Sequence, residues 1–182
     1  MTLSATLPMT RRCFFATAGL TVAAGAVRAG EPAAESTDLP KAELLSDGDA
    51  NTYLLVFHTG QEVMKGLLAF ARKHKLVAGH LTGIGAVRDA VLGYFDPHKK
   101  AYLRTHEKGQ ADVLSLTGNL ARNNNEPFFH VHAALGRRGG SARGGHLFEA
   151  TVRTTVELVL TAYPRPVRRK TDPETGLPLL DP

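Results

Sequence analysis

Hydrophobic and polar residues alternate over most of the second half of the chain, which is the pattern of half-buried β-strands. The alternation is clearest at 150–163, where Val152, Val156 and Leu158 share one side of the predicted strand. Thr, Val and aromatic residues are frequent in these segments, and all of them favour strands. The predicted strands cover residues 52–57, 76–81, 87–95, 101–105, 112–122, 128–135 and 150–163.

One segment follows a helical period instead. Between residues 61 and 74, Val63, Leu67 and Phe70 recur at spacings of three and four, which predicts an amphipathic helix packed on a sheet. One early helix followed by many strands predicts an α+β domain (an α/β-type fold) with a mostly antiparallel or mixed sheet and one principal helix packed on it.

Two closely spaced glycines, Gly83 and Gly85, separate two of the predicted strands. Glycine is favoured in tight turns and where another backbone approaches closely. We therefore expect Gly83 and Gly85 to form a turn or a close-packing position, for example at a subunit interface.

The first 29 residues have the features of an export signal. They contain Arg11, Arg12 and Arg28 but no acidic residue, and a mild apolar run ends at a Val-Arg-Ala cleavage pattern. The Arg11-Arg12 pair, followed by Phe14, resembles the twin-arginine motif of bacterial signals. The run is too short and too rich in Ala and Gly for a stable membrane span, and its apolar residues cover the whole circumference, which argues against an amphipathic helix.

Loss of this segment would change the charge of the protein. The 182-residue chain has 22 basic and 17 acidic residues and a net charge of +5, and cleavage after Ala29 leaves 19 basic residues and a charge of +2. The sole cysteine, Cys13, is lost with the signal, which suits an oxidising periplasm. The following residues 30–50 are small, polar and Pro-bearing, and we expect a flexible lead-in. The basic balance therefore indicates export to the periplasm, or secretion, more than nucleic-acid binding.

The sharpest chemical feature is a His-x-His pair, His130 and His132, on a predicted strand. Residues two apart point to the same face of a strand, so two imidazoles can converge on one metal ion. His146, which follows two glycines, is a third candidate ligand. Three histidines with an open fourth position are typical of a catalytic zinc site, but a His-x-His pair can also line a polar sheet face without any metal.

Several motifs in a fixed order resemble the plant and prokaryote conserved (PPC) domain family. They are Gly83-Ile-Gly-Ala-Val87, Leu92-Gly-Tyr-Phe-Asp96, Val113-Leu-Ser-Leu-Thr-Gly-Asn119, Phe129-His-Val-His-Ala133, Gly144-Gly-His-Leu147 and Asp172-Pro-Glu-Thr-Gly-Leu177. The resemblance implies one domain at 51–178 with a short tail at 179–182. It also implies a homotrimer and a metal, taken as zinc, at His130, His132 and His146.

Three functions stay open at this point. The first is an exported metal-binding protein that binds or transforms a small molecule. Glu149 is the one candidate for a catalytic base, and no other catalytic residue and no other cofactor is predicted. The second is DNA binding, which the plant relatives imply. The basic segments 137–143 and 165–170 favour it. The chain, however, has no Arg-Gly-Arg-Pro hook, and the export signal argues against contact with DNA. The third is a structural or interaction module without catalysis.

Overall fold

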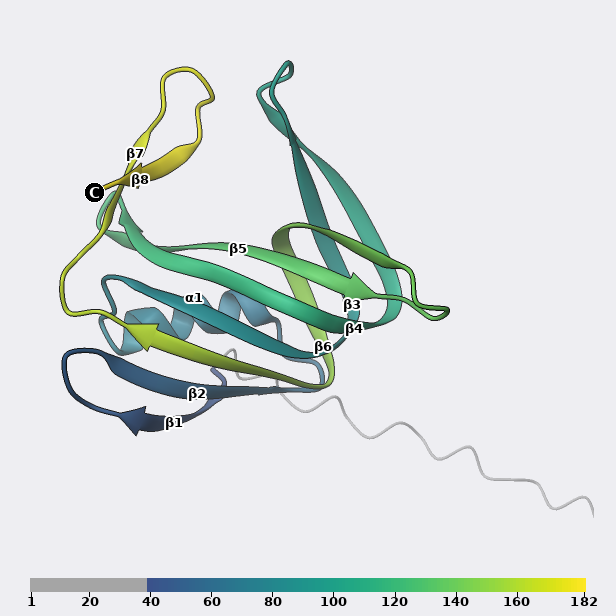
Figure 1. Ribbon diagram of the computed structural model, residues 1–182, viewed down its shortest axis with the longest axis horizontal. Helices are drawn as coiled ribbons and strands as arrows, with labels where there is room; N and C mark the ends of the chain where they lie inside the picture. The colour runs from purple at the N-terminus through teal and green to yellow at the C-terminus, as the bar shows by residue number, and fades with distance from the viewer. Residues whose placement is uncertain (1–38) are drawn as a thin grey trace, which may run out of the picture. The chain divides into compact units, whose positions relative to one another are not determined.

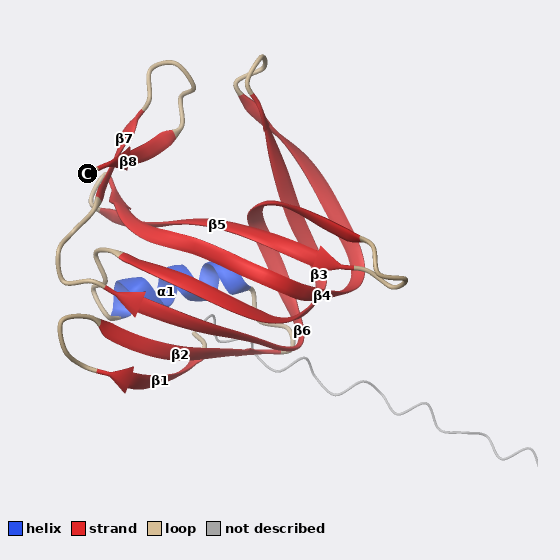
Figure 2. Ribbon diagram, in the orientation of Figure 1, coloured by secondary structure: helices blue, strands red, loops and turns tan. Residues whose placement is uncertain are grey.

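The computed structural model describes residues 39–182, which form one eight-stranded sheet and one helix (Figures 1 and 2). The elements, in chain order, are β1 Lys41–Ser46, β2 Asn51–His58, α1 Val63–Lys73, β3 Gly79–Asp96, β4 Ala101–Asn123, β5 Glu126–Gly136, β6 Ala142–Ala162, β7 Arg168–Thr171 and β8 Pro178–Asp181. No helix within this part of the chain is long and apolar enough to cross a membrane.

The sheet is antiparallel except for one bridge, and it closes partly on itself. Its main path runs β1-β2-β6-β3-β4-β7-β8, and only β4 and β7 pair in parallel. Strand β5 lies off this path and pairs with both β4 and β6. Strands β3, β4, β5 and β6 therefore form a closed ring of pairings, so that residues far apart in the sequence meet where β5 joins β6.

The predicted fold class is wrong, because the structure is dominated by strands. Strands take up 67% and helix 8% of the described residues, so the domain is a sheet-dominated fold and not α+β. The physical reason is strand length. Segments predicted as separate short strands, such as 76–81 and 87–95, are parts of one bent strand of 18 residues, β3. The predicted arms 101–105 and 112–122 likewise belong to the 23-residue β4.

The predicted helix and its packing face are confirmed. Val63, Leu67 and Phe70 are buried in the hydrophobic core, and α1 lies on one face of the sheet (Figure 2). The side chain of Glu62 caps the helix by accepting hydrogen bonds from the backbone N–H groups of Met64 and Lys65, at 3.0 and 2.7 Å. These are two of the N–H groups that have no acceptor within a helix.

The two ends of the described chain contain strands that the sequence pattern did not predict. Strand β1 lies within the expected flexible lead-in at 30–50, and all six of its residues are exposed. Strands β7 and β8 form a hairpin near the C-terminus, and β8 includes most of the expected tail at 179–182. The predicted signal segment, with Arg11 and Arg12, lies outside the described residues.

Candidate metal centre

The alternation of β5 places two histidines on the face opposite the core. Phe129 and Val131 are 4% and 0% exposed and pack in the hydrophobic core. His130 and His132 occupy the intervening positions and are half-buried and exposed, respectively. Because neighbouring side chains on a strand point to opposite faces, packing of Phe129 and Val131 forces both imidazoles to the same outer face.

Strand β6 brings the third histidine to the same place. His146 pairs directly with His132 in the antiparallel β5–β6 ladder, and on its other side it pairs with Gly93 of β3. The glycines that precede His146 allow β6 to come this close to β3. A Cβ atom on Gly145 would lie 2.6 Å from the carbonyl oxygen of Gly93. The backbone of β6 therefore fits between its neighbours only without a side chain at residue 145.

The three imidazoles form a compact cluster. One ring nitrogen from each of His130, His132 and His146 lies within 4.8 Å of the others. The Nε2 atoms of His130 and His132 are 3.2 Å apart, and the ring centroid of His146 is 5.1 Å from that of His130 and 5.7 Å from that of His132. This is the only cluster of three or more His, Cys, Asp or Glu ligands found among residues 39–182.

Burial and neighbouring charges favour the neutral imidazoles that metal binding requires. Burial lowers the pKa of His146 to about 4, and His130, His132 and Arg104 contribute to the shift. Burial, followed by the charges of His132 and Arg169, also lowers the pKa of His130 from its usual 6.5. Both residues are therefore neutral at pH 7 and offer free lone pairs to a cation.

Three imidazoles are a donor set that suits a tetrahedral transition metal, and one pair of them already has the spacing of such a site. With Zn–N distances near 2.0–2.1 Å, two ligand nitrogens in a tetrahedral site lie roughly 3.3 Å apart, close to the 3.2 Å between His130 and His132. The Nδ1 atom of His146 is buried and has no hydrogen-bond partner among the described residues. A buried polar atom without a partner is costly, and a metal ion is one kind of partner that would satisfy it.

Aromatic side chains enclose one side of this cluster. Tyr102 of β4 and Phe148 of β6 contact His146, with ring centroids 4.8 and 4.7 Å away. Together with Phe128 they line a pocket of about 190 Å³ that also includes His130 and His146. Gly93 leaves the space for this wall, because a Cβ atom there would lie 2.5 Å from the Phe148 ring.

Sequence reasoning missed these aromatic residues, although a signal for them exists. Phe128 and Phe148 lie two positions from His130 and His146, so a strand places each on the same face as its histidine. Tyr102 and Arg169 carry no such signal, since they come from β4 and β7 and reach the pocket only through the tertiary fold.

The other candidate residues from the sequence lie away from the histidine cluster in the structure. Glu149 is exposed and lines a different depression with Asp89, His106 and Glu107, so the described structure gives it no contact with the three histidines. Gly83 and Gly85 lie inside β3, where the strand continues instead of turning. Added Cβ atoms there would collide with the backbone of β6, at 2.3 and 2.4 Å, so both glycines mark close packing within the chain.

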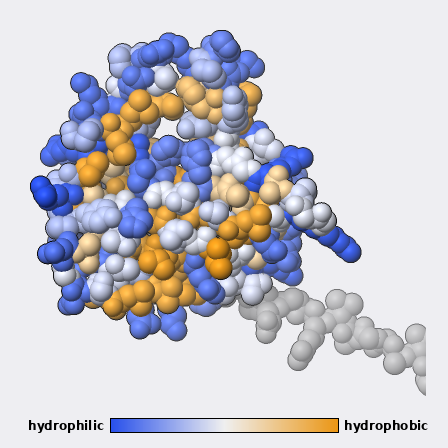
Figure 3. Space-filling view, viewed as in Figure 1, coloured by the Kyte–Doolittle hydropathy of each residue, from blue (hydrophilic) through white to orange (hydrophobic). Residues whose placement is uncertain are grey.

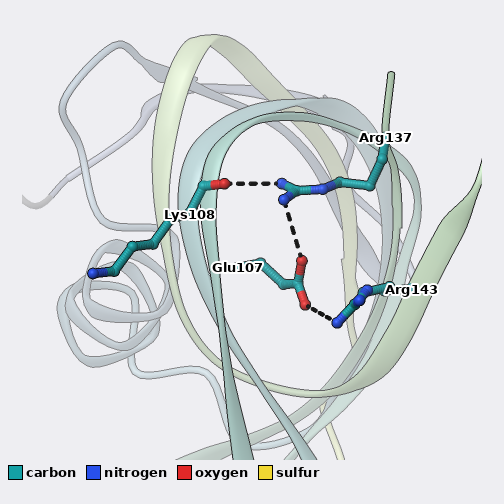
Figure 4. Close-up of polar contacts among 4 residues, drawn as sticks. All are labelled: Glu107, Lys108, Arg137 and Arg143. Carbon is teal, nitrogen blue, oxygen red and sulfur yellow. Dashed lines mark hydrogen bonds and ion pairs between the residues drawn. The ribbon is translucent and has the colours of Figure 1, made fainter. Parts of the chain in front are cut away.

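The basic loop after β5 is partly neutralised within the molecule. Glu107 of β4 is buried, with 4% exposure, and its carboxylate forms ion pairs with Arg143 at 3.3 Å and Arg137 at 3.7 Å (Figure 4). Arg137 also donates a hydrogen bond to the carbonyl oxygen of Lys108, at 3.1 Å. Two of the three arginines in the basic segment 137–143 therefore bind to β4, and this weakens the case for a free polyanion-binding patch.

Comparison with protein families now identifies the domain. The model of the Plants and Prokaryotes Conserved (PCC) domain matches residues 45–164, which include the helix and all three histidines. The chain belongs to this family, the PPC family. The matched segment starts earlier than the predicted domain at 51–178 and ends before β7.

Solved structures agree with this membership. The chain is similar to a metal-containing protein from Archaeoglobus fulgidus, with 32% identity, a TM-score of 0.68, and coverage of 79% of this chain and 99% of that one. It is similar to a PPC protein from Pyrococcus horikoshii, with 31% identity, a TM-score of 0.68, and coverage of 78% and 95%. An inferred DNA-binding protein from Bacteroides thetaiotaomicron has 30% identity, a TM-score of 0.72, and coverage of 77% and 96%. No curated protein matches the chain significantly.

Proposed function

We propose that this PPC protein binds a divalent transition metal, zinc, through His130, His132 and His146. The observation that carries the proposal is the convergence of three ring nitrogens within 4.8 Å. One of the three histidines, the half-buried His146, has a buried Nδ1 atom without a partner in the described chain. Three protein ligands leave a coordination position open, which is the arrangement of catalytic and ligand-binding zinc sites. A zinc ion held there supplies a Lewis acid.

The chain's own residues would orient and shield this centre. Burial keeps His146 neutral, and the rings of Tyr102 and Phe148 limit access of water from one side. His132 is exposed, so the cluster stays accessible to a small molecule from the opposite side. We infer a site that binds a small molecule next to a metal, without assigning a reaction.

Metal analysis of protein purified without an affinity tag tests this proposal. We expect close to one zinc per chain in the wild-type protein and a large loss in a His130→Ala, His132→Ala double variant. A His98→Ala, His106→Ala variant removes two exposed histidines elsewhere and serves as the matched control. Equal metal content in the wild type and the His130/His132 variant would overturn the proposal.

We further propose that the protein is a homotrimer, as family resemblance implies. Support comes from an apolar surface formed by Ile84, Leu114 and Val159, which are 60%, 56% and 38% exposed and line one shared groove on β3, β4 and β6. Exposed apolar clusters of this kind are typical of interaction surfaces. Figure 3 shows apolar side chains at the surface of the face in view.

Light scattering of the wild type and of Leu114→Lys tests the assembly. A monomeric wild type would contradict the proposed trimer.

The location that we propose is the periplasm, or the outside of the cell, after twin-arginine export. It is supported by Arg11, Arg12 and the acid-free first 29 residues. Changing both arginines to lysine is expected to leave the precursor in the cytoplasm, and unchanged export would contradict the proposed route.

DNA binding is the second candidate function, and the relative from Bacteroides thetaiotaomicron favours it. True phosphate contacts would make the affinity for duplex DNA fall steeply as salt rises. Binding without salt dependence, or no binding at all, would remove this candidate.

A further inference from the structure

The pocket beside the histidine cluster has a wall that comes from the C-terminal hairpin. Arg169 of β7 and the apolar residues Leu177, Pro178 and Leu179 face Tyr102 and Phe148 across it. The hairpin lies after residue 164, where the segment matched by the family model ends. This wall is therefore formed by residues outside the segment that the family model matches.

Arg169 is held rigidly in this wall and keeps an uncompensated charge. Its Nη1 atom donates a 2.6 Å hydrogen bond to the carbonyl oxygen of Pro178, its Nη2 atom donates to the Oδ1 atom of Asn119, and its guanidinium lies 4.9 Å from the centre of the Phe128 ring. The Nε atom is buried and has no hydrogen-bond partner in the described chain. All of these protein acceptors are neutral.

A second arginine contacts the aromatic wall of this pocket without lining the pocket itself. The guanidinium of Arg104 lies 4.0 Å from the centre of the Phe148 ring, which itself contacts His146. Neither Arg104 nor Arg169 forms an ion pair with a carboxylate within residues 39–182. Two unpaired guanidinium groups beside a cation-binding histidine cluster create a positive field, and an anion is the ligand that this field attracts.

The pocket's size and lining define the rest of the ligand. An apolar cavity of about 150 Å³ holds one benzene molecule, so the volume of about 190 Å³ suits a single ring with one small polar group. Tyr102, Phe148 and Leu177 offer apolar surface to such a ring. A phosphate or sulfate ion would leave this surface without a partner.

We propose that the pocket binds a small monocarboxylate with an apolar body about the size of one ring. Its carboxylate lies on the side of Arg169 and the histidine cluster, and its body packs between the aromatic wall and the C-terminal hairpin. This inference rests on the proposed metal function, since a bound cation adds to the same positive field.

Calorimetric titration of the zinc-loaded full-length protein with benzoate tests the proposal. Benzamide has nearly the same shape without the charge, and acetate has the charge without the ring. We expect benzoate to bind at least about tenfold more tightly than either probe. Benzamide lacks the charge that the guanidinium attracts, and acetate lacks the ring that the apolar wall would bury. Benzamide or acetate binding as tightly as benzoate, or no benzoate binding, would overturn the proposal.

Variants of the two arginines test which side chain supplies the positive charge that attracts benzoate. Arg169→Gln is expected to weaken benzoate binding about tenfold and to leave benzamide binding unchanged. Arg168→Gln changes the preceding, exposed residue of β7 and should leave both unchanged. Because Arg169 also bonds to Asn119 and Pro178, Arg104→Gln provides a second variant outside those bonds, and it should weaken benzoate selectively as well. Benzoate binding at wild-type strength in both the Arg169 and Arg104 variants would overturn the proposal.

A zinc titration without benzoate separates this inference from the function on which it rests. A protein that takes up zinc at the three histidines but does not bind benzoate contradicts the carboxylate proposal alone. A protein that does not take up zinc contradicts the metal function, whatever benzoate does.

Discussion

His132 on β5 and His146 on β6 are direct partners in the antiparallel ladder, with perpendicular rings whose centroids are 5.7 Å apart. The register of this pairing decides whether the metal centre exists. A slip of one residue would turn His146 to the other face of the sheet. Any change that disturbs the approach of β6 to its neighbours should therefore affect metal binding before it affects the rest of the fold.

The first prediction concerns the two glycines before His146. Gly145→Ala should weaken zinc binding at least about tenfold, because the new Cβ atom would lie 2.6 Å from a backbone oxygen of Gly93 and force β6 away from β3. Gly144→Ala is the control, since its Cβ atom would lie 3.1 Å from the nearest atom, a milder contact. Zinc titration of both variants checks the prediction, and equal affinities would contradict it.

The second prediction is a loss of stability on acidification of the metal-free protein. The pKa of His146 is about 4 in the folded protein and near 6.5 when the chain unfolds, so below pH 6.5 the unfolded state binds the proton more readily. The contribution of His146 to stability is therefore complete above pH 6.5 and is lost as the pH falls toward 4.

Urea unfolding at several pH values between 7 and 4, with a chelator present, checks this prediction. Other groups also titrate in this range, so the comparison is with His146→Gln, in which the free energy of unfolding should depend less steeply on pH. Parallel curves for the two proteins would show that His146 is not the source of the dependence.

The third prediction concerns the buried carboxylate of Glu107. An Arg137→Ala, Arg143→Ala variant should lose about 3–5 kcal/mol of stability, because it leaves this carboxylate buried at 4% exposure without a cation. Glu107→Gln should cost less, about 1–3 kcal/mol, since the two arginines it releases are 30% and 64% exposed and can be solvated.

Denaturant unfolding of the two variants gives this order directly. Hydrogen exchange adds a local readout, since amide protection in the loop at 137–141 should fall in both variants while protection in α1 stays unchanged. If Glu107→Gln were less stable than the Arg137→Ala, Arg143→Ala variant, the buried carboxylate would not be the group that requires a charged partner.

The fourth prediction concerns Glu62, which joins the helix to the strand that carries His146. Its carboxylate accepts hydrogen bonds from the N–H groups of Met64, Lys65 and Ala150, at 3.0, 2.7 and 2.9 Å. Glu62→Ala removes a helix cap and leaves an N–H group of β6 unsatisfied, so stability should fall by about 1–2 kcal/mol or more. Thermal or urea unfolding measures it, and Glu43→Ala on the exposed strand β1 should change stability little.

Much of the local structure was predictable because the signals are local. Apolar spacing identified the helix at 61–74, and period-two patterns identified parts of β2, β4, β5 and β6. The His-x-His spacing placed two imidazoles on one face for the same reason, since the geometry of a strand requires it.

The fold class was not predictable in the same way. In the sequence, Gly83 and Gly85 favour either a turn or a close-packing position. In the structure β3 continues through both glycines close to β6, and its pairing register shifts around Gly85. A glycine that allows a turn also allows close packing, and only the position of the neighbouring strand distinguishes the two.

The sequence by itself determined the alternation that separates the core face from the histidine face of β5, and the family motifs that contain all three histidines. Only the tertiary structure decided that β6 pairs with β5 in the register that opposes His146 to His132, and that Tyr102 and Arg169 reach the same pocket. The physical reason is that side-chain direction follows from the backbone period within one strand, whereas pairing between strands depends on packing and contacts across the whole domain.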